Sequence, residues 1–172
     1  MIELSELLDP SRMRCQCDIR SKKRAFQTLA ELLATSIDDL QRQQTPPKDE
    51  NSEEEHTDMQ IFEAFFSRER LGCTGLGHGV ALPHSRMANL EEPVAALITL
   101  AEGIDFEAPD GQPVDLLVGL LVPEHCNDEH LKILAGLAKR FNDDYFREKM
   151  RGFGNGQAAD LYAFLQKQAP AA

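Results

Sequence analysis

The chain of 172 residues carries 18 basic and 29 acidic side chains, which gives a net charge of -11 and a pI near 4.9. Binding to nucleic acid or to an anionic membrane needs a basic face, which this composition does not supply. The length suits a single domain, and the apolar runs are too short to span a bilayer. Because the first ten residues carry acids where a signal peptide carries bases, we expect a cytoplasmic protein without direct membrane insertion.

The N-terminal part of the chain predicts a strand followed by a helix. Residues 13–17, MRCQC, alternate apolar and polar side chains as a half-buried strand does. Ser21 can cap a helix whose apolar residues recur at helical spacing. These residues are Phe26, Leu29, Leu32, Leu33 and Ile37. The four cysteines form no disulfide framework or CXXC pair, so we expect reduced thiols.

Residues 38–58 form an acidic segment. It holds eight acids and two bases, the pair Pro46-Pro47 and almost no apolar residue. Such a segment cannot bury enough apolar surface to fold alone. We predict a flexible acidic insertion within one domain that spans 1–172, with a regulatory or partner-binding segment as the alternative.

A second helix is predicted from Thr57 or Asp58 to Gly72, which suits a left-handed stop. Arg68 and Arg70 fall in its last turn, where cations complement the helix dipole, so a structural role for either stays open. The continuous apolar runs 94–100 and 114–122 predict central strands covered on both faces, and the turn residues between them predict a long connection. The fold class is therefore α/β.

A helix is predicted after Pro123, capped by Asn127 or Asp128, with His130 in its first turn. Its expected inner face consists of Leu131, Leu134, Leu137 or Ala138, and Phe141. Two short helices, DDYFREKMR and AADLYAFLQKQ, complete the cover of the sheet.

The stretch from Arg68 to His84, RERLGCTGLGHGVALPH, combines a glycine-rich loop with a histidine that follows a proline. Pro83 fixes its own φ and favours an extended Leu82, so His84 is held at a stiff strand end. A neutral imidazole can attack a phosphoryl group, and such transfer depends on positioned donors for the phosphoryl oxygens. The candidate donors are Arg68, Thr74 and His130.

This stretch, together with QPVDLLVGLLVP and EHLKILAGLAKR, resembles the enzyme IIA domains of the bacterial phosphotransferase system, in the fructose/mannitol and nitrogen-regulatory branch. The resemblance implies the IIA fold, a central mixed sheet with helices on both faces. It implies that His84 is the phosphorylated nucleophile, supported by Arg68 and His130, and that Thr74 is the threonine of the glycine loop. Cys73, His78 and Ser85 differ from the residues common in the family at these places.

The same resemblance implies a phosphocarrier that takes its phosphoryl group from an HPr-like protein of the sugar or the nitrogen branch. No metal, nucleotide or other cofactor is implied. The lone domain favours a nitrogen-regulatory IIA that signals to targets such as transporters or sensor kinases. A free-standing sugar-transport IIA that passes phosphate to a IIB domain is the alternative within the family, and a non-catalytic interaction module of the same fold is the alternative outside it.

Three other functions, a zinc site, a cysteine hydrolase and a nucleotide-binding loop, have weaker support in the sequence than a phosphocarrier. The side chains of Cys73, His78, His84, Cys126 and His130 are ligand types that suit zinc, but their spacing matches neither CXXC nor HEXXH. A hydrolase with a cysteine nucleophile lacks an oxyanion-hole pattern, and the glycine loop lacks the GK[ST] ending of a nucleotide-binding loop.

Overall fold

Two long apolar strands form the centre of the sheet. β5 (Val94–Ile104) and β6 (Val114–Pro123) pair antiparallel, and nearly all of their residues are buried. On the far side of β5, strand β1 (Met13–Cys17) pairs parallel to it. The computed structural model describes residues 2–44, 57–88, 90–126 and 128–168. The predicted central strands and the half-buried N-terminal strand are thus confirmed.

The other edge of β6 carries the segment that leads to His84. Strands β3 (Val80–Ala81) and β4 (His84–Met87) both pair parallel with β6, and β2 (Gly75–Gly77) pairs antiparallel with β3. The register is the same on both sides of Pro83, because 80 pairs with 116 and 84 with 120, a separation of 36 in each case. The sheet is therefore mixed, and β3 and β4 follow one another along the same side of β6, interrupted at Leu82 and Pro83.

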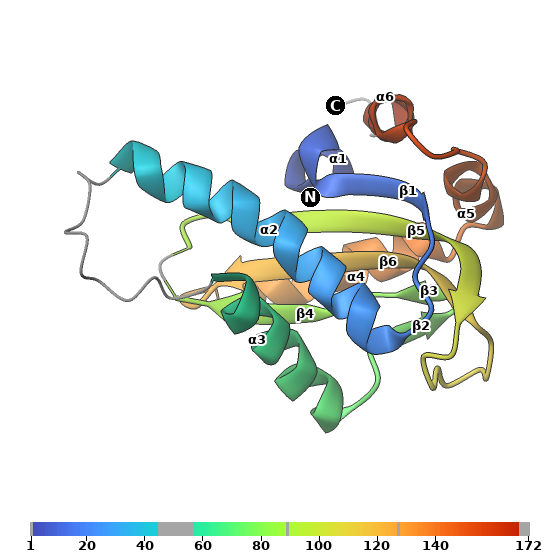
Figure 1. Ribbon diagram of the computed structural model, residues 1–172, viewed down its shortest axis with the longest axis horizontal. Coiled ribbons are helices and arrows are strands. Elements are labelled where there is room, and N and C mark those ends of the chain that lie inside the picture. Colours follow the sequence, from blue (N-terminus) through green and yellow to red (C-terminus); the bar gives the residue numbers. More distant parts are fainter. Residues whose placement is uncertain (1, 45–56, 89, 127, 169–172) are drawn as a thin grey trace.

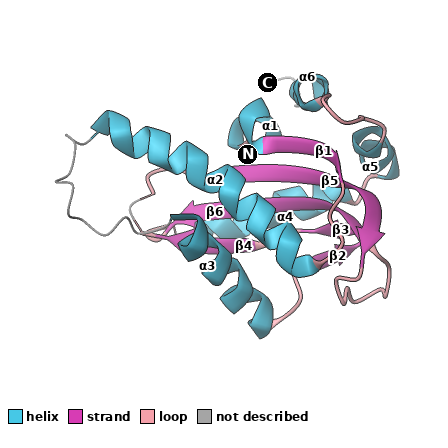
Figure 2. Cartoon of the chain, in the orientation of Figure 1, coloured by secondary structure: helices cyan, strands magenta, loops and turns pink. Residues whose placement is uncertain are grey.

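Helices cover both faces of the sheet (Figures 1 and 2). On one face, α2 (Lys22–Gln44) and α3 (Thr57–Leu71) pack over a core that includes Phe26, Phe65 and Phe106. The opposite face is covered by four helices, namely α1 (Leu4–Leu7), α4 (Asp128–Phe141), α5 (Asp144–Arg151) and α6 (Ala158–Gln168). A single turn of 3₁₀ helix, Pro10–Arg12, leads into β1. The α/β architecture with cover on both faces matches the prediction.

Several local expectations can be compared with the structure. Ser21 caps α2, because its Oγ accepts a hydrogen bond from the Arg24 N–H at 3.1 Å. This helix continues to Gln44, so the acidic segment begins as helix instead of as a loop at residue 38, and residues 45–56 lie outside the described part of the chain. Gly72 ends α3 without a left-handed φ, which corrects the expected stop.

The inner face of α4 agrees with the prediction at Leu137 and Phe141 and differs in its first turns. Ile133, Leu137 and Phe141 are buried, whereas Leu131 is 58% exposed. The predicted set, at 131, 134, 137 or 138 and 141, and the buried set, at 133, 137 and 141, both recur at helical spacing. The packing of the helix on the sheet therefore decides between them. Of the two predicted caps, Asn127 is not among the described residues and Asp128 is the first helical residue. No helix in the described ranges is long and apolar enough to cross a membrane.

Candidate functional site

His84 opens β4 directly after Pro83. The Pro83 carbonyl accepts a hydrogen bond from the Leu120 N–H at 2.9 Å, which fixes the backbone before His84 to β6. The Nδ1 atom of His84 lies 2.8 Å from the carbonyl oxygen of Leu82. Because a carbonyl oxygen can only accept, the neutral ring carries its proton on Nδ1 and its lone pair on Nε2. The imidazole is therefore held through Nδ1, and Nε2 is the atom available for chemistry.

Two of the predicted partners act electrostatically on this ring. Burial lowers the pKa of His84 below its ordinary value of 6.5, and the charge of Arg68 and that of the protonated form of His130 lower it further. The hydrogen bond to Leu82 and the carboxylate of Glu69 act in the opposite direction. The structure thus couples Arg68 and His130 electrostatically to His84, and the lowered pKa favours a neutral His84 ring at pH 7.

Arg68 also stabilises the end of α3. Its Nη1 donates to the Gly72 carbonyl at 3.0 Å, one of the carbonyls that a helix C-terminus leaves without a partner. The structural role that its place in the last turn suggested is therefore present. It coexists with the electrostatic effect of Arg68 on His84.

Thr74 is buried within a chain of contacts that we call the Lys22–Glu69–Thr74 network. The Thr74 hydroxyl donates to the Glu69 carboxylate at 2.6 Å, and the Thr74 N–H lies 3.2 Å from both carboxylate oxygens. Lys22 Nζ lies 2.6 Å from the same carboxylate and 4.2 Å from the ring centre of Phe106. The Thr74 carbonyl accepts from the Leu82 N–H at 3.0 Å. The network thus links α2 and α3 to the strand that carries His84.

This network changes the expected contribution of Thr74. A hydroxyl has one proton to donate, and here Glu69 accepts it. Thr74 is also only 6% exposed. In this conformation it holds the glycine loop in place, and direct donation to a phosphoryl oxygen stays a prediction.

The tip of the glycine loop is held by two charged side chains. Residues 77–79 all have positive φ values, of 87°, 56° and 80°. The N–H of His78 donates to the Asp110 carboxylate at 2.9 Å, and its carbonyl accepts from Arg151 at 2.7 Å. Arg151 also pairs with Asp115 at the start of β6. The predicted connection at 101–113 therefore supports the loop as well as joining two strands.

The two cysteines of the rival zinc site have other contacts. In the described part of the chain, no group of three or more His, Cys, Asp or Glu side chains could hold a metal ion. The Cys73 thiol lies 3.6 Å from the Phe106 carbonyl, and the Cys126 thiol lies 3.8 Å from Glu129. Burial raises the pKa of both thiols. A raised pKa reduces the thiolate fraction that a cysteine nucleophile needs.

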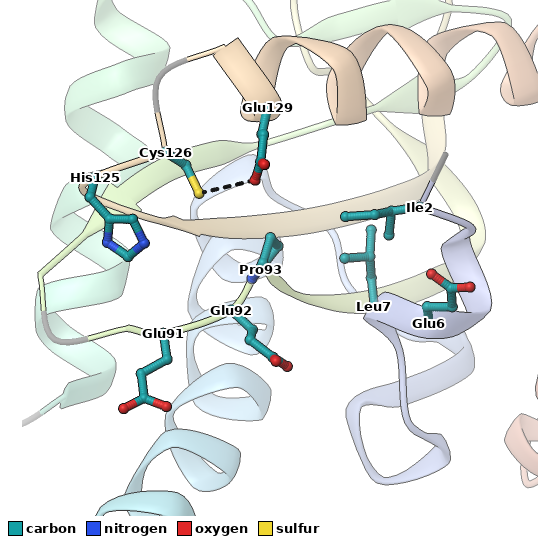
Figure 3. A pocket seen from close by; sticks show the side chains of 9 residues that line it. All are labelled: Ile2, Glu6, Leu7, Glu91, Glu92, Pro93, His125, Cys126 and Glu129. Atoms are coloured by element: carbon teal, nitrogen blue, oxygen red, sulfur yellow. Dashed lines mark hydrogen bonds between the residues drawn. The ribbon is translucent and has the colours of Figure 1, made fainter.

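A cavity of about 590 Å³ lies beside the first turn of α4 (Figure 3). Its lining residues are Ile2, Glu6, Leu7, Glu91, Glu92, Pro93, His125, Cys126 and Glu129. His84, Arg68, Thr74 and His130 are absent from this lining, so the cavity is separate from the candidate site.

Comparison with known proteins identifies the family. The family described as "Phosphoenolpyruvate-dependent sugar phosphotransferase system, EIIA 2" matches residues 6–168. The chain belongs to this family. Among EIIA 2 relatives, the nitrogen regulatory protein of Pseudomonas aeruginosa is 35% identical over 158 residues, which cover 92% of each chain. The nitrogen regulatory protein of Escherichia coli is 34% identical, over 95% of this chain and 90% of its own.

Solved structures of IIA proteins agree with this assignment. The crystal structure of the nitrogen regulatory protein IIA-Ntr from Neisseria meningitidis has a TM-score of 0.77 and is 34% identical, covering 94% of this chain and 98% of its own. IIA mannitol from Escherichia coli has a TM-score of 0.63 at 18% identity, over 90% and 98% of the two chains, and shows the shared fold alone. The family and fold predicted from the sequence are confirmed. Membership in EIIA 2 implies phosphoryl transfer in general terms.

Several supporting residues were missed by the sequence reasoning. Glu69 stands inside the recognised stretch, next to Arg68, but its partner Lys22 is far away in the sequence. Arg86 follows His84 by two residues and lies 3.5 Å from His130. Strand alternation was the one available signal for Arg86, because it places residues 84 and 86 on the same face.

Proposed function

We propose that the chain is a cytoplasmic phosphocarrier of the nitrogen-regulatory type, which accepts a phosphoryl group on Nε2 of His84 from a phosphohistidine of an HPr-like carrier. The contact between His84 Nδ1 and the Leu82 carbonyl is the observation that supports this most, because it leaves a lone pair on Nε2 of a neutral ring. Arg68 and His130 are the proposed partners of the phosphoryl oxygens. Thr74 shapes the adjoining loop.

In the proposed step, the Nε2 lone pair attacks phosphorus while the phosphorus–nitrogen bond of the donor breaks. The donor imidazole leaves with the bonding electron pair. As the new bond forms, the His84 ring gains positive charge, which the Leu82 carbonyl at 2.8 Å stabilises. Arg68 and the N-terminal turn of α4 favour the anionic phosphoryl group. One phosphoramidate replaces another, so the transfer is reversible and needs no metal or nucleotide.

Features of the surface support docking of a protein partner. Leu71 and Leu76 lie between Arg68 and the loop tip, and Leu131 follows His130. These three leucines are 84%, 40% and 58% exposed. A net charge of -11 favours a basic partner, whose rate of association should fall with added salt. Phosphorylation adds negative charge at one half-buried ring, so a partner can distinguish the two forms by electrostatics.

Downstream partners are proposed by class. The relatives named nitrogen regulatory proteins favour regulatory targets, for which transporters and sensor kinases are the proposed classes. A IIB domain is the alternative, and a IIA–IIB complex is known for the mannitol proteins of Escherichia coli. We propose a single domain over 1–172 with the acidic segment 38–58 as an insertion; α2 extends to Gln44, and residues 45–56 lie outside the described part of the chain.

The test is intact-mass measurement after incubation with phosphoenolpyruvate, enzyme I and an HPr-type carrier of either branch. We expect one acid-labile phosphoryl adduct, which is lost in His84→Ala and forms more slowly in His130→Ala. His125→Ala is the matched control, because His125 is an exposed histidine outside the site. An adduct that persists in His84→Ala would contradict the assignment of the nucleophile.

The same variants separate the rival functions. Transfer from the phosphorylated protein to a IIB domain would support the sugar-transport alternative. Absence of any adduct with both carriers would favour the non-catalytic interaction module. A module of that kind should also keep all its effects on partners in His84→Ala, whereas a phosphorylation switch should lose them.

A further inference from the structure

Arg86 is an exposed residue that the site as described so far does not use. Side chains alternate along a strand, so His84 and Arg86 project from the same face of β4. Leu82, which has the same parity, packs in the cluster beneath α4. Arg86 pairs with Val122 near the end of β6, from which the chain turns into α4. The strand register therefore places Arg86 beside the first turn of α4.

Arg86 contacts one ring nitrogen of His130 in that turn. Its Nη2 lies 3.5 Å from Nδ1 of His130. A guanidinium keeps its protons and has no acceptor, so Nδ1 of His130 must be the acceptor in this contact. A neutral imidazole that accepts at Nδ1 carries its proton on Nε2. A hydrogen bond from Arg86 to Nδ1 would therefore favour one of the two tautomers of His130.

We propose that Arg86 is a positioning residue that keeps neutral His130 in the Nε2–H tautomer, so that His130 offers a donor to the phosphoryl group on His84. This inference rests on the proposed function. The other tautomer would present a lone pair to phosphoryl oxygens, and two acceptors repel each other. Arg68 contacts the Gly72 carbonyl, whereas Arg86 contacts His130. The two arginines therefore have different roles in the site.

The tautomer can be measured without any partner protein. The ¹⁵N chemical shifts of the two His130 ring nitrogens, measured by NMR at a pH where the ring is neutral, distinguish a protonated from a bare nitrogen. We expect the proton on Nε2 in the wild type and a mixture of tautomers in Arg86→Met. Arg86→Lys should restore the wild-type tautomer, because lysine is also a donor without an acceptor. Arg20→Met is the matched control, at an exposed arginine that pairs with Asp18.

A second measurement connects the tautomer to transfer. In Arg86→Met, the rate of phosphoryl acceptance should fall about tenfold, less than the loss expected when a donor is removed outright. Arg86→Lys should recover most of the rate. A proton on Nδ1 in the wild type, or unchanged nitrogen shifts in Arg86→Met, would overturn the inference, as would a changed tautomer with an unchanged rate. Failure of the wild type to accept any phosphoryl group would instead count against the proposed function, since the tautomer measurement does not depend on it.

Discussion

The Lys22–Glu69–Thr74 network allows a quantitative prediction for Glu69→Gln. The Glu69 side chain is only 8% exposed, and Lys22 Nζ lies 2.6 Å from it with the lysine side chain 22% exposed. Removing one partner of a fully buried ion pair costs about 3–5 kcal/mol, but this lysine stays partly hydrated. Glutamine can still accept from Thr74, so the loss is mainly that of charge. We expect a decrease of about 2 kcal/mol in the free energy of unfolding, and a Tm lower by about 4–8 °C for a domain of this length.

The effect should depend on pH in a defined direction. Burial raises the pKa of Glu69, but the Lys22 ammonium and the Thr74 donors together outweigh it and hold the pKa below the ordinary value of 4.5. A carboxyl group with a depressed folded pKa contributes stability above its unfolded pKa and loses it as the pH falls through the folded value. The difference between wild type and Glu69→Gln should therefore be full at pH 7.5 and should shrink below pH 4.5.

The assay is urea unfolding at pH 7.5 of Glu69→Gln, Lys22→Met and the double variant. The double-mutant cycle should give a coupling of about 1 kcal/mol or more between the two side chains. Glu63→Gln, at an exposed position on the same helix, is the control and should change stability by less than about 0.5 kcal/mol. A coupling near zero, or an effect of Glu69→Gln no larger than that of the control, would refute the reasoning.

Three further predictions concern the ring, the loop and the core. Arg68→Gln should raise the pKa of His84 in an NMR titration, because the positive charge of Arg68 lowers it, and a fall would contradict this assignment. Gly79→Ala should lower the free energy of unfolding, measured in urea, by about 2 kcal/mol, because φ is 80° and a Cβ would lie 2.5 Å from Nη2 of Arg151. A variant as stable as the wild type would show that the loop relaxes. Phe26→Ala should cost about 3–5 kcal/mol, because the ring is fully buried against three other phenylalanines, and a loss below about 1 kcal/mol would mean that the core closes around the gap.

Local patterns in the sequence determined the elements that carry the site. The runs 94–100 and 114–122 predicted central strands because a strand covered on both faces has no solvated side and so shows no alternation. The place of His84 at a strand end followed from the fixed φ of Pro83 and the restriction that it imposes on Leu82. Each of these inferences depends only on residues that are neighbours along the chain.

The contacts within the site were decided by the tertiary structure. Lys22 meets Glu69 because α2 and α3 pack on the same face of the sheet, and Arg86 meets His130 because β4 pairs in register with the strand that leads into α4. The sequence contains these residues but not the order of the strands or the faces that the helices cover.

The orientation of α4 follows the same rule. Two apolar stripes on this helix have helical spacing, and packing on the sheet buried Ile133 while it left Leu131 exposed. Helical periodicity shows that a helix has an apolar face, but the packing of the helix on the sheet selects which stripe is buried. Local chemistry in the sequence therefore pointed to the candidate site residues, whereas strand order and helix packing determined which residues contact them.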